Sequence, residues 1–385
     1  MPSFSRTAAV LSAGMLVTGT LNTLLTKLQD QQCIANCDDP DPAKRQLFEQ
    51  PVWQTLNMFY GEMLCLACLY AMGLFRRSAG STAAAVAAAA PDGYQPIPDS
   101  ASDSDSADTP ASANTADALP LKPITGWATL YMWLPAVCDL LGTTLMNVGL
   151  FFTSASVYQM LRGAVVVFSG LFSVVFLGHR LERFQVISLG MVVVGVTIVG
   201  LSNVISPPAS AHSAAAAAAN HNVLKAAVGV ALVLGAQLFT ASQFVIEEKI
   251  IRRYHLTPLR AVGLEGSFGA ATVMAAIPVL HVAIGRSHPG GYFDAPVGFR
   301  QIIDNPSVWQ TSIYIMLSIA MFNYFGLSVT RHLSATSRAT IDTCRTLFIW
   351  MSSQALGWES FSWVQVVGFV ILVYGTFVYN RVISL

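Results

Sequence analysis

Residues 154–177 read SASVYQMLRGAVVVFSGLFSVVFL, an apolar run that contains one charged side chain, Arg162. About 20 apolar residues in a helix cross the roughly 30 Å hydrocarbon core of a bilayer, so this run is long enough to span a membrane. Similar runs recur along the chain, which is 54% hydrophobic and only 11% charged. A soluble domain of this size needs a larger charged surface. The sequence therefore predicts an all-α membrane protein.

Working outward from this run, we predict ten transmembrane helices. They are Ala8–Leu28, Trp53–Phe75, Trp127–Phe151, Ser154–Leu177, Gln185–Ile205, Val223–Val245, Arg260–Ile284, Val308–Val329, Ser334–Leu356 and Phe361–Tyr379. The first run resembles a signal peptide, but we expect it to be retained as a span because it is long and nine further spans follow.

Two low-complexity segments divide the chain. Residues 78–120 are rich in Ala, Ser and Asp, and residues 206–221 contain Pro207-Pro208 and a poly-alanine run. Segments of this composition bury too little apolar surface to fold, so we predict a disordered cytosolic linker and a lumenal linker. Residues 1–205 then form an N-terminal unit of five spans, and residues 222–385 form a C-terminal unit of five spans.

The loops assign an orientation, because lysine and arginine accumulate on the cytosolic side of membrane proteins. With the N-terminus in the cytosol, eleven basic residues face that side: Arg6, Arg76, Arg77, Lys122, Arg180, Arg183, Lys249, Arg252, Arg253, Arg331 and Arg381. The opposite side holds Lys44, Arg45, Arg286 and Arg300. With ten spans, both termini then face the cytosol.

The two units contain matching landmarks. Thr153-Ser-Ala-Ser156 precedes Leu177-Gly178, Gly190 and Gly195, while Leu333-Ser-Ala-Thr336 precedes Leu356-Gly357, Gly368 and Gly375 at similar spacing. Because each unit has an odd number of spans, the second copy enters from the opposite side of the membrane. Two inverted repeats of this kind are common in alternating-access transporters, which bind cargo at the repeat interface near the midplane.

At this point the sequence resembles a known family. Residues 153–178 closely resemble the fourth span of the F branch of solute carrier family 35. Three further segments are similar to that branch: Glu247-Glu-Lys249; Pro258-Leu-Arg-Ala-Val-Gly263 with Glu265-Gly266; and Ser334-Ala-Thr-Ser-Arg338 with Asp342 and Arg345-Thr346. The likeness covers nearly all ten spans and leaves out the two linkers and the short C-terminal tail.

The resemblance implies the drug/metabolite transporter fold and an endomembrane location, in the lysosome, vacuole or Golgi, with the lysosome favoured. The wider family's name implies nucleotide-sugar transport. The chloroquine-resistance transporters resemble the chain more distantly, and they imply cationic cargo. The Gly-Ala-Leu-Asn-Lys motif, with which nucleotide-sugar carriers contact the nucleotide, has no literal match in the ninth predicted span.

Ionisable side chains within spans mark candidate transport residues, because each one costs roughly 3 kcal/mol or more at the centre of a bilayer. The candidates are Glu62, Asp139, Arg162, Glu265, Asp342 and Arg345. Uncharged polar residues at helical spacing add further candidates for a hydrated pathway: Asn22, Thr143, Gln237 and Gln243.

The ninth predicted span is the most informative. Arg338, Asp342, Arg345 and Thr346 fall at i, i+4, i+7 and i+8, which places them on one stripe of a helix. Arg162 and Asp342 both lie seven residues beyond the matched alanine of their repeat, so we expect an ion pair between the repeats. These charges either handle cargo or only hold the bundle together.

Three carboxylates have open roles. Glu62 and Asp139 have no cation within one turn of their own helix, so they could exchange protons during transport or form ion pairs with Arg162 or Arg345. Glu265 either belongs to the site or stabilises the first turns of its helix, where the macrodipole favours an anion.

The remaining chemistry is sparse. Cys65 and Cys68 form a C-x-x-C inside an apolar run with no nearby histidine, so we expect packing and no metal or cofactor. Cys33 and Cys37 could form a disulfide in an oxidising lumen. A net charge of zero excludes an electrostatic case for nucleic acid, which leaves the lipid bilayer and a small solute, with or without protons, as expected partners. The sequence leaves a homodimer open.

These observations favour a secondary transporter that moves a small organic solute by alternating access. A membrane scaffold that binds partner proteins is the alternative from another class, and an exporter of cationic or amphiphilic solutes or peptides is the alternative within the transporters. A membrane enzyme fits least, because no paired aspartates, histidine cluster or Ser/His arrangement occurs at membrane depth.

The orientation can be tested with a tag at each terminus in sealed, right-side-out organelle vesicles. We expect added protease to remove both tags, because both termini face the cytosol. Protection of either tag would contradict the ten-span orientation.

Overall fold

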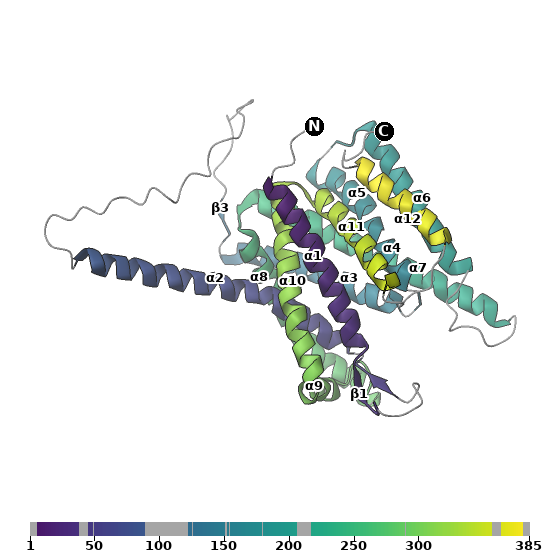
Figure 1. Ribbon diagram of the computed structural model, residues 1–385, viewed down its shortest axis with the longest axis horizontal. Helices are drawn as coiled ribbons and strands as arrows, with labels where there is room; N and C mark the ends of the chain where they lie inside the picture. Colours follow the sequence, from purple (N-terminus) through teal and green to yellow (C-terminus); the bar gives the residue numbers. More distant parts are fainter. Residues whose placement is uncertain are drawn as a thin grey trace.

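The protein is a bundle of long helices in the computed structural model (Figure 1). The structure describes residues 6–37, 45–48, 50–88, 122–124, 126–150, 152–153, 155–178, 180–205, 217–288, 290–355 and 363–379. The helices of the first half are α1 (Arg6–Asp30), α2 (Pro51–Ala88), η2 (Gly126–Met132) with α3 (Trp133–Leu150), α4 (Ala155–Leu161), η3 (Arg162–Ala164), α5 (Val165–Leu177) and α6 (Arg183–Ile205). Those of the second half are α7 (Ala217–Arg253), α8 (Pro258–Ala283), η5 (Gly285–Ser287), α9 (Ala295–Asp304), α10 (Pro306–His332), α11 (Ala335–Ala355) and α12 (Trp363–Tyr379).

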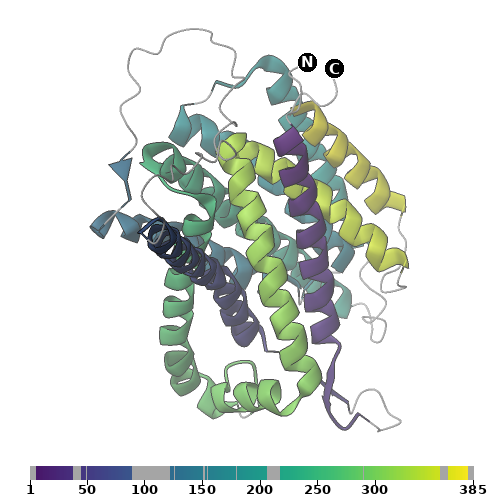
Figure 2. The same cartoon turned by 60° about the vertical axis from the view of Figure 1, so that its left-hand side comes forward.

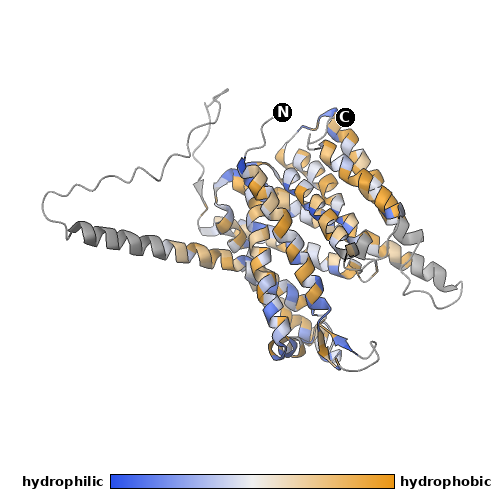
Figure 3. Cartoon of the chain, in the orientation of Figure 1, coloured by the Kyte–Doolittle hydropathy of each residue, from blue (hydrophilic) through white to orange (hydrophobic). Residues whose placement is uncertain are grey.

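A helix lies at each of the ten predicted positions. Within the described ranges, eight helical segments are long and apolar enough to cross a bilayer, so the chain is an all-α membrane protein. Helix α12 is apolar but has only 17 residues. Helix α11 has 21 residues and carries Arg338, Asp342 and Arg345. Figure 3 shows hydrophobic residues along the outward faces of the helices and hydrophilic residues at the ends of the bundle.

Both linker predictions are wrong at one edge. Helix α2 continues to Ala88, eleven residues into the linker predicted at 78–120, and α7 begins at Ala217 within the linker predicted at 206–221. Both extensions are rich in alanine, which has the highest intrinsic helix propensity. Residues 89–121 and 206–216 lie outside the described ranges.

The helices pack in pairs that join the two halves of the chain. Helix α1 packs against α10, α2 against α8, α3 against α7, α5 against α11, and α6 against α12. Helix α1 begins and α12 ends at the same end of the bundle, as both views show (Figures 1 and 2). Two short strand pairs lie outside the helices: β1 (Cys33–Ala35) with β2 (Gln46–Leu47), antiparallel, and β3 (Lys122–Pro123) with β4 (Tyr254–His255), parallel.

The β1–β2 hairpin contains the cysteine pair that the sequence left open. Cys33 and Cys37 form a disulfide with their Cα atoms 5.7 Å apart. Cys65 is buried and packs in an apolar cluster with Ile250, Leu256 and Leu327, as expected for a structural cysteine.

Glycines bring α6 and α12 into close contact. A Cβ atom on Gly195 would lie 2.7 Å from both the Gly368 carbonyl oxygen and the Leu372 amide nitrogen. A Cβ atom on Gly375 would lie 3.0 Å from the Ser188 carbonyl oxygen. Gly195 and Gly375 therefore allow the two helices to pack closely. Gly190 has no such role, because a Cβ atom there would meet nothing within 4 Å.

This difference gives a matched pair of substitutions. Gly195→Ala should lower the free energy of unfolding by about 1–3 kcal/mol, because backbone atoms of α12 cannot move aside as a side chain can. Gly190→Ala should leave it unchanged or raise it by up to about 1 kcal/mol through helix propensity. Thermal unfolding in detergent measures both. Equal unfolding temperatures for the two variants would contradict the close packing of α6 on α12.

Candidate functional site

Helix α11 carries the charges at the centre of the bundle. Arg338 is 1% exposed, and Asp342 and Arg345 are each 4% exposed. Charged side chains are rarely buried to this extent unless other groups pair with them. Their partners come from four other spans, and these partners define two groups of charges.

The first group surrounds Arg338. Its guanidinium donates to the Glu247 carboxylate of α7, which is fully buried, and it stacks 4.1 Å from the centre of the Phe244 ring. The neighbouring Glu248 accepts the Ala335 backbone N–H at 2.7 Å, and it pairs with Arg252 at 2.5 Å. The two adjacent glutamates of α7 therefore hold the first turn of α11 in place.

Three more carboxylates belong to this group. Asn323 of α10 donates to Glu62 at 2.5 Å, Gln243 donates to Glu265 at 2.9 Å, and the Thr143 hydroxyl lies 3.4 Å from Asp139. The charges of Glu62, Asp139, Glu247, Glu265 and Arg338 all act on one another electrostatically. We call these five residues the acidic group.

The acidic group is not internally neutral, because its four carboxylates face one guanidinium. In the described part of the chain, Glu62 Oε2 and Glu247 Oε1 are buried without a hydrogen-bond partner. A buried carboxylate without a partner is costly. The group therefore favours a proton or a cationic group of a ligand.

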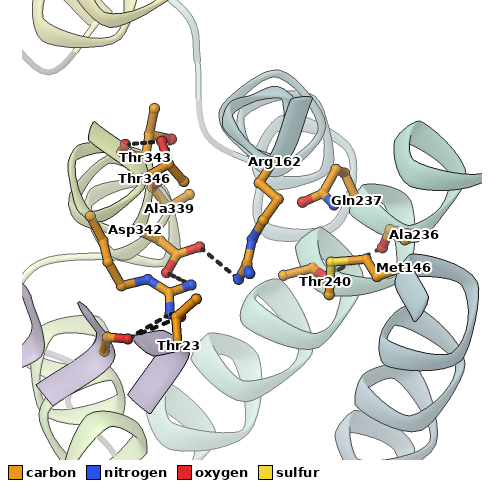
Figure 4. Close-up of polar contacts among 12 residues, drawn as sticks. Thr23, Met146, Arg162, Ala236, Gln237, Thr240, Ala339, Asp342, Thr343 and Thr346 are labelled. Carbon is orange, nitrogen blue, oxygen red and sulfur yellow. Dashed lines mark hydrogen bonds and ion pairs between the residues drawn. The ribbon is translucent and has the colours of Figure 1, made fainter. Parts of the chain in front are cut away.

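The second group surrounds Asp342, and we call it the basic group. Arg345 pairs with Asp342 at 2.7 Å, and Arg162 reaches the other Asp342 oxygen at 3.9 Å (Figure 4). Arg345 also donates to the Gly19 carbonyl of α1 at 3.3 Å, and it lies 4.7 Å from the Phe322 ring centre. The structure thus contains the ion pair between equivalent positions of the two halves that the sequence predicts.

Arg162 lies where the fourth span changes its winding. Helices α4 and α5 are α-helical, whereas the turn Arg162–Ala164 between them has 3₁₀ geometry. A short 3₁₀ turn inside a helix often marks a functional hinge. Figure 4 shows the Arg162 side chain extending between Asp342 on one side and Gln237 and Thr240 of α7 on the other.

The stripe predicted on the ninth span meets partners in both groups. Arg338 belongs to the acidic group, whereas Asp342 and Arg345 belong to the basic group, so the stripe serves two sets of partners. Glu265 is 3% exposed among other carboxylates, which its proximity to the start of the helix did not indicate. No ion pair with Arg162 or Arg345 is present for Glu62 or Asp139 among the described residues.

Two predicted residues take no part in the ion pairs. Asn22 donates to Ser318 at 3.0 Å and to the Ile315 carbonyl at 3.3 Å, so it joins α1 to α10. Gln237 donates to the Val233 carbonyl of its own helix at 3.2 Å. The candidate list missed Glu247 and Asn323. The helical spacing of Gln237, Thr240, Gln243 and Glu247 could have indicated the former.

Within the described ranges, no cluster of histidine, cysteine and carboxylate side chains could hold a metal ion. Charged side chains from both halves of an all-α bundle, buried at its centre, define a class: a multi-pass membrane transporter for a small solute. The chain belongs to solute carrier family 35. It is 37% identical to solute carrier family 35 member F6 of Homo sapiens over 96% of this chain and 88% of that protein.

Three other comparisons are consistent with this family and fold. An uncharacterized protein of Schizosaccharomyces pombe is 34% identical over 96% of each chain. The model of the nucleotide-sugar transporter family matches residues 120–262. A crystal structure of a protein that is 12% identical superposes with a TM-score of 0.50 over 98% of this chain and 97% of that one, which shows similarity of fold alone.

The buried Arg338–Glu247 pair predicts a difference between two arginine substitutions. Arg338→Gln should destabilise the protein by about 3–5 kcal/mol, because it leaves Glu247 charged and buried without its partner. Adding Glu247→Gln should restore most of that loss. Arg252→Gln removes the partner of Glu248, but the Arg252 side chain is 55% exposed, so water can replace it, and Glu248 keeps its hydrogen bond from the Ala335 N–H. It should therefore cost less than Arg338→Gln, about 1 kcal/mol.

Thermal unfolding of the four proteins in detergent measures these effects. A double variant no more stable than Arg338→Gln alone would show that Glu247 is not the group stranded by the loss of Arg338.

Proposed function

We propose that this protein is a secondary transporter of an endomembrane that moves a small organic solute by alternating access, coupled to protons. The observation that supports it most is the meeting of charges from both halves at one place: Arg162 from the fourth span with Asp342 and Arg345 from the ninth. A site shared between two units can be opened to either side by rocking one unit against the other.

The arrangement of helices supports two inverted repeats of five spans, residues 1–205 and 222–385. In this scheme α1 corresponds to α7, and α3 corresponds to α10. If every span is exchanged for the corresponding span of the other half, the α1–α10 contact becomes the α7–α3 contact. The same exchange maps the pairs α2–α8, α5–α11 and α6–α12 onto themselves. A two-fold relation between the halves accounts for this pattern, and the odd number of spans in each half makes the relation an inversion.

The disulfide supports the proposed orientation and location. With the N-terminus in the cytosol, the hairpin that follows α1 faces the lumen. Cys33 and Cys37 form their disulfide in this hairpin, and such bonds persist in oxidising compartments rather than in the cytosol. Membership of solute carrier family 35 supports a location in an endomembrane.

Proton coupling follows from the surplus of carboxylates in the acidic group. Glu62, Asp139, Glu247 and Glu265 share one guanidinium, and their repulsion decreases when a proton or cationic cargo binds. If protons and cargo compete for these carboxylates, release of one drives binding of the other. A membrane scaffold has no need of these charges at its centre, which favours the transporter.

Transport can be tested before the cargo is known. Purified protein in proteoliposomes should accumulate at least one solute from a small-molecule extract of cells, as measured by mass spectrometry of the washed vesicles. An outward-directed or inward-directed proton gradient should change the amount accumulated. Vesicles that never differ from protein-free controls would contradict the proposed function.

The basic group provides the matching variant. Asp342→Asn with Arg345→Gln removes both charges together, so neither is left unpaired, and the unfolding temperature should stay close to that of the wild type. Accumulation from the extract should fall at least tenfold, because Arg162 loses the carboxylate that connects it to the ninth span. Full accumulation by this stable double variant would remove the pair from the transport site.

A further inference from the structure

The two groups of charges have opposite sign and lie next to each other. In the acidic group, four carboxylates surround Arg338, whereas in the basic group two guanidiniums surround Asp342. Arg338 and Asp342 are four residues apart on α11, which is about 6 Å along a helix axis. A Cβ atom on Gly142, three residues beyond Asp139 on α3, would lie 3.4 Å from the Thr240 hydroxyl, and Figure 4 shows Thr240 beside Arg162. Asp139 therefore lies about one turn along α3 from the part of α7 that flanks Arg162.

Burial distinguishes two of these charged residues from the rest. Glu62, Glu247, Glu265, Arg338, Asp342 and Arg345 are all 4% exposed or less. The Arg162 side chain is 16% exposed, and Asp139 is also only partly buried. Among these eight residues, one anion and one cation are therefore not fully enclosed by the protein, and they come from adjacent spans.

The partners of these two residues leave them available for a ligand. Arg345 holds Asp342 at 2.7 Å, whereas Arg162 is 3.9 Å away, so Asp342 keeps its nearer partner when Arg162 turns to another anion. The Asp139 carboxylate faces the surplus carboxylates of the acidic group, and its hydrogen bond to Thr143 is a long 3.4 Å. Buried oxygens of Glu62 and Glu247 without hydrogen-bond partners add to the negative charge on that side.

We propose that the cargo is a small zwitterion, whose cationic amine binds Asp139 and whose carboxylate binds Arg162. This proposal rests on the transport function proposed above and names its substrate class. A solute with both charges satisfies both accessible residues at once, and a charged partner for each is what a desolvated site requires.

Other charge types fit the same two residues less well. A dianion such as a nucleotide diphosphate sugar would gain Arg162 but would approach the four carboxylates of the acidic group. A simple cation would bind Asp139 but would leave Arg162 paired only with Asp342 at 3.9 Å. The arrangement therefore selects against either charge alone, which is how sites obtain specificity by repulsion as well as attraction.

The test compares derivatives of one molecule that differ in charge. Proteoliposomes with wild-type protein are offered each L-amino acid that has an uncharged side chain, its amide, which is a cation, and its N-acetyl form, which is an anion. We expect at least one amino acid to be accumulated at least tenfold more than both its amide and its N-acetyl form. A tenfold to hundredfold preference corresponds to loss of one charged hydrogen-bond partner.

Two variants assign each end of the solute. Arg162→Gln should bring uptake of the amide close to that of the amino acid, because the carboxylate no longer has its partner. Asp139→Asn should do the same for the N-acetyl form. Arg162→Lys should retain the preference for the zwitterion. Each measurement is the ratio of two uptakes in one preparation, so a partial loss of folded protein does not change it. If a variant does not fold, the ratios measured for the wild type still test the proposal.

Accumulation from the cell extract in the same vesicles separates the two proposals. If the extract yields accumulated solutes but no amino acid is preferred over its derivatives, the zwitterion proposal is wrong and the transport function stands. Equal uptake of an amino acid and its amide by the wild type has the same meaning. If nothing accumulates from either source, both proposals are wrong.

Discussion

The need to neutralise buried charge determines where α11 lies. A helix with Arg338, Asp342 and Arg345 cannot face lipid, because each charge would be left without partners in the hydrocarbon core. It therefore lies against α7, the fourth span and α1, which supply Glu247, Arg162, and the backbone of Gly19. The almost charge-free helices α6 and α12 pack on each other through glycines at one side of the bundle. The most polar helix, α11, is thus central, whereas the apolar helices α6 and α12 have no buried charges that other helices must shield from lipid.

Much of this arrangement can be predicted from the sequence, because a lipid bilayer restricts which residues and which backbone structures can span it. The apolar runs give the positions of all ten helices, and the matched alanines at Ala155 and Ala335 give the pairing of Arg162 with Asp342. The alanine-rich ends of α2 and α7 were missed because low complexity indicates linkers, while alanine itself favours helix. Residues 89–121 lie outside the described ranges and leave that part of the prediction untested.

The division of the ninth span could not be predicted from one helix alone. A spacing of four residues places Arg338 and Asp342 on the same face, but it does not say which neighbour each will meet. Arg338 meets Glu247 because α7 crosses α11 near its first turn, where Glu248 also accepts the Ala335 N–H. The partners of Asn22 could not be predicted for a related reason, since a polar residue within a span serves helix packing as readily as a pathway. The part of the chain that resembles nucleotide-sugar transporters, residues 120–262, contains Asp139, Arg162 and Glu247 but none of the charges of α11.

The most direct test of the account is whether the interface between the two charge groups is reached from both sides of the membrane in turn. Thr143, beside Asp139, is partly buried and can be replaced by cysteine after Cys65, Cys68, Cys138 and Cys344 are removed and the Cys33–Cys37 disulfide is kept. Labelling with a membrane-impermeant thiol reagent is then measured from each side of sealed vesicles. The control is Gly190→Cys, because Gly190 is exposed on the outside of the helix bundle. The account predicts that Thr143→Cys is labelled from both sides and that a proton gradient shifts the ratio of the two rates. Labelling from one side only, whatever the gradient, would contradict alternating access at this site.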